Sequence, residues 1–183
     1  MGKRAVILLA PGYEELEAVA VVDILRRAGI DALLAGLTSD PVPSARNVRI
    51  IPDCTIEQAS AEEFDLIVLP GGLDGTERLK KEPLVREMLK KQLDQGRYVG
   101  AICAAPTILD EHGFSAGSTI TCHPVCQQVL KRSTLSQERV VRDGQIITSQ
   151  GPGTALEFAL KLVEVLEGRA KMEEVNRGVL ARI

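Results

Sequence analysis

Apolar residues follow two different periods along this chain. Nearly continuous apolar runs, such as Ala5–Ala10, Asp65–Leu69 and Tyr98–Ile102, are typical of parallel strands that are buried on both faces. Between the runs, apolar residues recur at helical spacing, most clearly over Glu14–Ala28, and Gly29 ends that pattern. The alternation of the two periods predicts an α/β fold with a mainly parallel sheet.

The rest of the chain continues this alternation. No low-complexity linker, repeat or break in composition divides it, so we expect one domain over residues 1–183. Asp143-Gly144 predicts a hairpin turn, and Pro41–Arg46 a turn-rich loop. The further strands predicted are Ala32–Leu37, Val48–Ile51, Thr119–Thr121, Val140–Val141 and Gln145–Thr148, and the further helices are Leu84–Leu93, Ala104–Leu109, Thr154–Leu166 and Met172–Leu180.

Composition excludes several classes of function. The net charge is −3 and only 3% of residues are aromatic, so specific nucleic-acid binding and binding to anionic membranes lack electrostatic and stacking support. The first apolar run is too short for a signal peptide or a membrane span. The 4 cysteines form no C-x-x-C pair, which favours reduced thiols in a cytoplasmic protein.

The strongest chemical signal is Cys103. It directly follows the strand predicted at Tyr98–Ile102 and precedes the helix predicted at Ala104–Leu109. Ligands of parallel sheets bind at the carboxyl ends of strands, and a helix N-terminus stabilises a thiolate. Because free cysteine is also among the most buried residue types, an inert core cysteine is the competing interpretation.

Two further segments are expected at the same edge of the sheet. Gly71-Gly72 ends a buried strand, and its backbone amides could form an oxyanion hole with that of Ala104, although a plain turn would look the same. The acidic cluster Glu14-Glu15-Leu16-Glu17 opens the first helix. Most acidic residues there only complement the helix dipole, but one facing the cysteine could relay a proton.

A fourth segment, Cys122-His123-Pro124-Val125-Cys126, carries three side chains able to bind metal or take part in catalysis. His123 could pair with Cys103 as a base. The spacing matches no zinc pattern and has no distant partner motif, so we expect neither a metal nor another cofactor.

Together these segments resemble the ThiJ/PfpI superfamily, and most closely its branch of the Parkinson-disease-associated deglycase and bacterial YajL. The resemblance rests on five segments that follow the family's order over nearly the whole chain. They are Leu8–Glu17, Val68–Gly72, Ala101–Pro106, Thr121–Pro124 and Thr148–Ala155.

The resemblance implies a flavodoxin-like three-layer sandwich and a homodimer. It implies that Cys103 is the nucleophilic, oxidation-prone residue and that Glu17 is the acid bonded to its sulfur. It matches Gly72 and Ala104 to the backbone donors. His123 matches a histidine near the cysteine, whose role it leaves open.

Departures from related branches narrow the expected activity. Protease-like members carry histidine after the cysteine, where this chain has Ala104, and amidotransferases flank the cysteine with glycines, where it has Ala101 and Ala105. Peptidase activity is therefore not expected. At position 150 this chain carries glutamine, whereas the Parkinson-disease-associated protein carries arginine. The glutamine is nearer the bacterial pattern.

The resemblance implies cysteine-dependent handling of 2-oxoaldehydes: a glutathione-independent glyoxalase, a deglycase acting on glycated amines, or both. The alternatives are a redox sensor or oxidative-stress chaperone, in which Cys103 becomes a sulfinic acid, and a structural protein with an inert cysteine. The sequence features are identical for the first two, so the sequence alone does not separate them.

Overall fold

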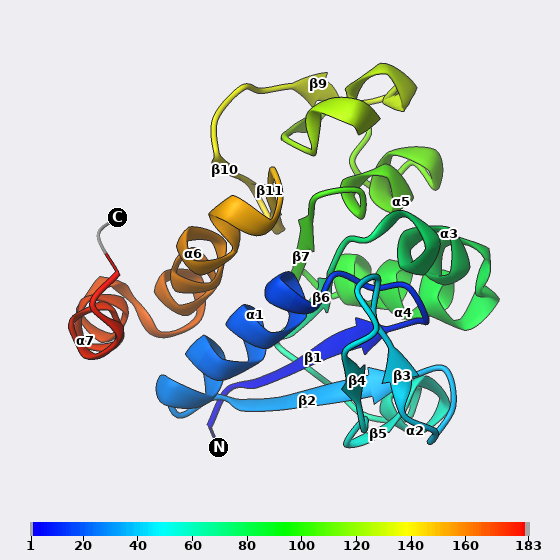
Figure 1. The fold of residues 1–183 in the computed structure, drawn as a ribbon. Coiled ribbons are helices and arrows are strands. Elements are labelled where there is room, and N and C mark those ends of the chain that lie inside the picture. Colours follow the sequence, from blue (N-terminus) through cyan, green and yellow to red (C-terminus); the bar gives the residue numbers. More distant parts are fainter. Residues whose placement is uncertain (1, 182–183) are drawn as a thin grey trace.

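The computed structural model describes residues 2–181, and its centre is a seven-stranded sheet (Figure 1). Its strands are β1 (Arg4–Leu9), β2 (Asp31–Gly36), β5 (Cys54–Thr55), β6 (Leu66–Leu69), β7 (Tyr98–Ile102), β10 (Val140–Asp143) and β11 (Ile146–Ser149). They lie in the order β10-β11-β7-β6-β1-β2-β5, and only β10 pairs in the antiparallel direction. This confirms the predicted α/β class with a mainly parallel sheet.

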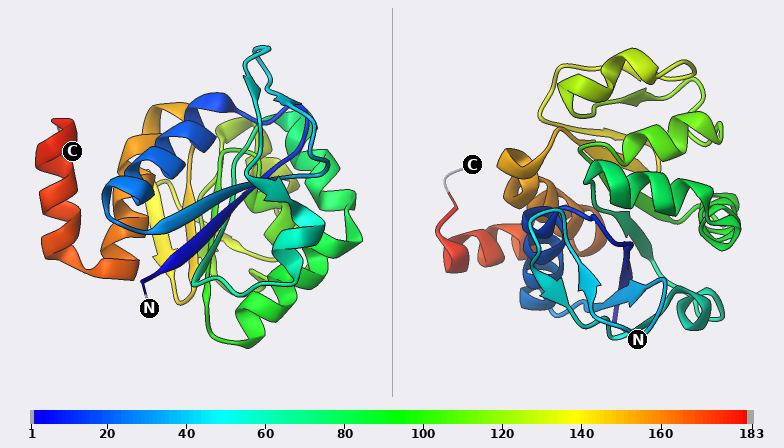
Figure 2. Two further views of the ribbon diagram at one scale, coloured as in Figure 1. Left: turned by 90° about the horizontal axis from the view of Figure 1, so that it is seen from below. Right: turned by 45° about the vertical axis from the view of Figure 1, so that its right-hand side comes forward.

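Helices cover both faces of the sheet (Figure 2). The helices are α1 (Glu15–Arg27), α2 (Ile56–Ser60), α3 (Leu73–Lys81), α4 (Pro83–Asp94), α5 (Pro106–Glu111), α6 (Ala155–Glu167) and α7 (Arg169–Val179). One apolar cluster joins α1 and α6 to one face, and a second joins α2, α3, α4 and α5 to the other. α7 packs on the outside of α6. The result is a three-layer sandwich whose strands β1, β6, β7 and β11 are almost completely buried, as the continuous apolar runs predict for central strands.

Several short elements lie outside the main sheet. The strands β3 (Val42–Pro43) and β4 (Arg49–Ile50) form a separate antiparallel ribbon, and β8 (Thr119–Ile120) pairs with β9 (Thr134–Leu135) in another small sheet. The strands predicted at Val48–Ile51 and Thr119–Thr121 therefore exist only as short pairs outside the main sheet. Two 3-10 helices are η1 (Pro124–Val129) and η2 (Pro152–Thr154).

The helix predicted at Ala104–Leu109 begins later than expected. Residues 103–105 form a turn, and α5 starts at Pro106. Proline is well suited to this first position because its missing N–H would have no intrahelical partner there. Cys103 is therefore separated from α5 by a tight turn, and the individual turn amides matter more for its chemistry than the dipole of this short helix.

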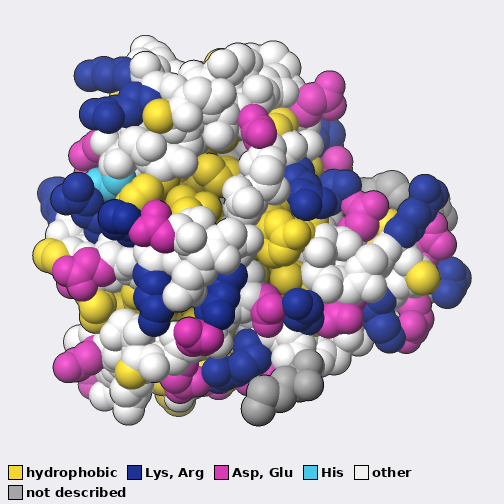
Figure 3. Space-filling model, turned by 180° about the vertical axis from the view of Figure 1, so that it is seen from behind, with side chains coloured by type: hydrophobic (Ala, Val, Ile, Leu, Met, Phe, Trp, Pro, Cys, Tyr) yellow, Lys and Arg dark blue, Asp and Glu magenta, His cyan; other side chains and the backbone are white. Residues whose placement is uncertain are grey.

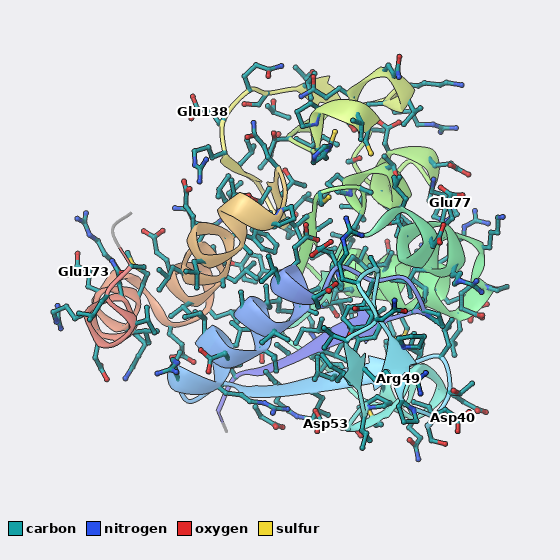
Figure 4. All side chains as sticks on the ribbon, in the orientation of Figure 1. Asp40, Arg49, Asp53, Glu77, Glu138 and Glu173 are labelled. Carbon is teal, nitrogen blue, oxygen red and sulfur yellow. The ribbon has the colours of Figure 1, made fainter. Side chains whose placement is uncertain are left out.

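The surface mixes both charges with apolar side chains. Figure 3 shows Lys and Arg interspersed with Asp and Glu over the rear face, and the charged residues labelled in Figure 4 lie at the periphery, such as Glu77 on α3 and Glu173 on α7. Within residues 2–181, no helix combines the length and apolar character that a bilayer crossing requires.

Candidate active site

Three neighbouring strands place the candidate site at their carboxyl ends. Cys103 follows β7, Gly71 and Gly72 follow β6, and the first turn of α1, which carries Glu17, follows β1 and a short turn. These strands are adjacent in the order β7-β6-β1. The carboxyl edge of a parallel sheet therefore gathers residues that are far apart in sequence, as predicted.

Cys103 occupies a strained backbone conformation. Its φ is 65°, in the left-handed region that side chains other than glycine rarely adopt. Its N–H donates to the carbonyl of Ser149 at 2.9 Å, and its own carbonyl accepts from the N–H of His123 at 2.9 Å. These bonds to two other segments hold a conformation that costs about 1–2 kcal/mol. The sharp elbow presents the thiol at the end of β7.

The Glu17 carboxyl is buried beside this thiol. The residue is fully buried, and its Oε2 accepts a hydrogen bond from the N–H of Gly71 at 2.6 Å. Among the described residues, no partner is found for Oε1. Burial raises the pKa of Glu17 to about 7, although hydrogen bonds with Gly71 and Cys103 act in the opposite direction. The carboxyl group can therefore carry a proton near neutral pH, as a proton relay requires.

The environment of the Cys103 sulfur contains opposing influences. Burial and the negative charge of Glu17 raise the pKa of the Cys103 thiol, whereas the amides of Gly72 and Ala104 lower it. When Glu17 carries a proton, its charge vanishes and its O–H can donate to the sulfur, while both amides still favour the thiolate. Thiol and carboxyl thus share one proton, and the pair with a single negative charge is the reactive form.

These groups open onto a cavity of about 430 Å³. His123 lies on its wall, and the His123 Nδ1 accepts from the N–H of Val125 at 3.3 Å, so a neutral ring carries its proton on Nε2. The cavity is lined by Gly12, Glu14, Ala45, Arg46, Gly72, Leu73, Asp74, Cys103, Ala104, His123, Val125, Cys126 and Pro152.

The structure brings all five sequence-predicted site residues to this place. Cys103 and Glu17 are in contact, and the amides of Gly72 and Ala104 reach the sulfur. His123 is tied to Cys103 through its backbone, while its ring faces the cavity. Within the part of the chain that the structure describes, no cluster of three His, Cys, Asp or Glu side chains could hold a metal.

Two charged residues of the cavity, Arg46 and Asp74, were not predicted as site residues from the sequence. Arg46, next to the β3–β4 ribbon, brings a cation to the cavity, and Asp74 lies at the start of α3. Arg46 falls in a predicted loop without a motif, and only the fold shows that this loop reaches the site. Asp74 lies on a helix that its polar sequence did not reveal.

A flavodoxin-like sandwich with a cysteine on a strand-to-helix elbow and a buried carboxyl at its sulfur defines a class of cysteine-centred α/β proteins. The sequence model of the DJ-1/PfpI family matches residues 3–165, and the chain belongs to that family. This confirms the resemblance found in the sequence.

Individual relatives extend this assignment over the whole chain. Protein dj-1beta of Drosophila melanogaster is 45% identical over 183 residues, covering 98% of each chain. The glutathione-independent glyoxalase DJR-1.2 of Caenorhabditis elegans is 42% identical, over 92% of this chain and 91% of its own. The crystal structure of Drosophila melanogaster DJ-1beta superposes with a TM-score of 0.98 at 43% identity, covering 100% of both chains.

Proposed function

We propose that this protein converts reactive 2-oxoaldehydes such as methylglyoxal, free or bound to amines, through the thiol of Cys103. One observation carries the proposal: a buried carboxyl with a pKa of about 7, that of Glu17, contacts a cysteine held on a strained elbow at the edge of a cavity. The similarity to a relative named as a glutathione-independent glyoxalase supports the same chemistry.

The first step is attack on the aldehyde. The Cys103 thiolate forms a C–S bond to the carbonyl carbon, and the resulting oxyanion takes a proton from Glu17 to give a hemithioacetal. The amides of Gly72 and Ala104, which favour the Cys103 thiolate, support this step, because donors beside the sulfur can also stabilise an oxyanion that develops next to it. The Nε2–H of His123 offers a further donor from the cavity wall.

Later steps divide by substrate. With free methylglyoxal, Glu17 transfers the proton from the former aldehyde carbon to the neighbouring carbon, which leaves a lactoyl thioester, and water then releases lactate and the thiol. With a glycated amine, the C–S bond forms at the carbon that carries the nitrogen, the C–N bond breaks, and the amine leaves with a proton from Glu17. The hemithioacetal that results then undergoes the same proton transfer and hydrolysis. The first route is a lyase reaction and the second a hydrolase reaction, and neither consumes glutathione or a cofactor.

The test is lactate formation from methylglyoxal without glutathione. Cys103→Ala should abolish it, and Glu17→Gln should lower kcat by about 100-fold or more, because a general acid–base group contributes that much. Gly153→Ala is a matched control, since an added Cβ meets nothing within 4 Å there. Turnover by Cys103→Ala at the wild-type rate would contradict the mechanism.

A redox sensor or oxidative-stress chaperone is the second candidate function. The observation that favours it is the pair of amides, Gly72 and Ala104, directed at the Cys103 sulfur, because the same donors can bind the oxygens of a sulfinic acid. Selective oxidation of Cys103 by dilute peroxide, together with negligible aldehyde turnover, would favour this candidate over the enzyme.

The homodimer implied by the resemblance is also a proposal. It is supported by two apolar side chains in solvent: Leu16 on α1 is 61% exposed, and Ile51, directly after β4, is 73% exposed. Ile51→Glu should lower the molar mass measured by light scattering, whereas Glu57→Gln on α2 should not. A monomeric wild-type protein would contradict it.

A further inference from the structure

A second thiol, Cys126, lines the same cavity as Cys103. Cys126 is 6% exposed and lies in η1, the 3-10 helix that follows His123. With Cys122 it forms a small apolar cluster against Ala104, the residue directly after Cys103. The turn that carries the reactive cysteine is therefore packed against the segment that carries Cys126.

Two backbone hydrogen bonds connect the two cysteines through one residue. The His123 N–H donates to the Cys103 carbonyl at 2.9 Å, and the Cys126 N–H donates to the His123 carbonyl at 2.8 Å. η1 itself is exposed at Val125 and Val129. Short, solvent-exposed elements have few buried contacts and move more easily than core strands. A shift of η1 would therefore change the distance between the sulfurs of Cys103 and Cys126.

A second cavity also has Cys126 on its wall. It has a volume of about 630 Å³ and shares four lining residues with the first. Lys80 and Glu77, which form an ion pair, both line it. Burial raises the pKa of the Cys126 thiol, the Lys80 ammonium group lowers it, and the Glu77 carboxylate raises it. The shared residues are Leu73, Ala104, Val125 and Cys126. Cys126 thus lies on the wall of both cavities, one of which also contains Cys103 and the other Lys80.

The remaining thiols are placed differently. Cys122 is fully buried, its S–H points to the carbonyl of His123 at 3.5 Å, and it does not line the cavity of Cys103. Cys54 lies in β5 at the far edge of the sheet. Among the described residues, Cys126 is the one other cysteine on the wall of this cavity.

We propose that Cys126 is a resolving cysteine, which forms a disulfide with Cys103 after a hydroperoxide has oxidised Cys103. The inference rests on the reactive Cys103 thiol of the proposed function. In the first step the hydroperoxide transfers one oxygen to the Cys103 sulfur, giving a sulfenic acid and an alcohol or water. In the second step the Cys126 sulfur attacks that sulfur, the S–S bond forms, and hydroxide leaves as water with the Cys126 proton.

The disulfide would protect the active site. A sulfenic acid that meets no thiol is oxidised further to sulfinic acid, which ordinary thiols do not reduce, whereas a disulfide is restored by dithiol exchange. The S–S bond requires a Cα separation of roughly 4.4–6.8 Å, and under this proposal η1 moves until the two cysteines reach it. Oxidation would then store Cys103 in a recoverable form instead of destroying it.

The test is peptide mapping of the wild-type chain after one equivalent of hydrogen peroxide, without reductant. We expect a protein lighter by two hydrogens, a peptide pair joined through Cys103 and Cys126, and full reversal by dithiothreitol. When further peroxide is added to supply the second oxygen, Cys126→Ala should instead accumulate sulfinic acid on Cys103 several-fold faster than the wild type. Cys126→Ser serves as a second variant of similar size, and Cys54→Ala is the matched control.

Three outcomes would overturn the inference: wild-type Cys103 passing to sulfinic acid without any cross-link, a cross-link through Cys122, or equal rates of sulfinic acid formation in the wild type and both Cys126 variants. Lactate formation is measured on the same preparation in its reduced state, before peroxide is added. Turnover without the cross-link would overturn this inference alone, and the cross-link without turnover would overturn the proposed enzyme alone.

Discussion

The Glu17 carboxyl and the Gly71 amide are joined by a hydrogen bond of 2.6 Å, and this contact exists because position 71 has no side chain. A Cβ built at Gly71 would lie 2.7 Å from Oε2 of Glu17 and 2.5 Å from the Cβ of Cys103. Both distances are shorter than real Cβ contacts. The glycine therefore allows the acid and the thiol to approach each other.

Gly71→Ala should separate this pair. The methyl group has to displace Glu17, Cys103 or the backbone, so we expect a loss of about 1–3 kcal/mol in the free energy of unfolding and a large drop in aldehyde turnover. Urea denaturation and lactate formation measure the two effects. Gly153→Ala, which adds a methyl group in open space, should change neither. An active, equally stable Gly71→Ala variant would show that the site tolerates a wider gap.

The strain at Cys103 can be measured with two variants that both lack the thiol. Glycine adopts a φ of 65° without penalty and alanine does not, so Cys103→Gly should be more stable than Cys103→Ala by roughly 1 kcal/mol. Equilibrium unfolding in urea provides the comparison. Ala104→Gly, at the next position, is the control: it should lower the free energy of unfolding, because glycine there relieves no strain and makes the unfolded chain more flexible. A more stable Cys103→Ala would mean that the elbow relaxes without strain.

The sequence predicts the core strands well because each is a continuous apolar run. Tyr98–Ile102 is observed with the same bounds, and Asp65–Leu69 differs only at its first residue. Burial on both faces leaves little alternative for such runs. Predicted helices such as Leu84–Leu93 are likewise found, lengthened by a residue at each end.

Short elements escaped prediction because tertiary contacts define them. α3 (Leu73–Lys81) is polar and contains a glycine, which gives it little helical signal, and β5 (Cys54–Thr55) exists only through its pairing with β2. Some residues of the cavity are likewise defined by tertiary contacts and not by local sequence. The cysteine elbow has a local signature, whereas Cys126 and Arg46 become neighbours of Cys103 only when separate segments pack together.

Glu17 should make stability depend on pH. Its pKa is about 7 in the folded chain and 4.5 for an ordinary glutamate, so the folded state binds the extra proton between these values. The stability contribution is therefore complete below about pH 4.5 and is lost as pH rises through 7, a change of about 3 kcal/mol. Glu17→Gln cannot titrate and should lack this decline.

The measurement is urea unfolding of both proteins over this pH range. As pH rises, the free energy of unfolding of the wild type should fall relative to that of Glu17→Gln. Glu14→Gln, at the start of the same helix, should show the same pH dependence as the wild type. A constant difference between wild type and Glu17→Gln would show that Glu17 keeps an ordinary pKa.

Asp110 should hold in place the chain around residues 131–133, which follows η1. Its carboxylate accepts hydrogen bonds from the N–H groups of Lys131, Arg132 and Ser133 and from the Ser133 hydroxyl, at 2.7–2.9 Å. Burial opposes its ionisation, but these donors hold the pKa of Asp110 below its usual value on balance. Asp110 therefore stabilises the fold above about pH 4, and that stability is lost as pH falls.

Asp110→Ala leaves these donors without their acceptor and should cost about 2–4 kcal/mol at neutral pH. Hydrogen exchange should accelerate first over residues 124–135, because η1 and β9 flank the released amides. Asp94→Ala removes an exposed carboxylate that pairs with Lys90 at the end of α4, and it should change stability by less than about 1 kcal/mol. Unchanged exchange over 124–135 in Asp110→Ala would show that other contacts, such as the bond from His123 to Cys103, suffice to hold η1.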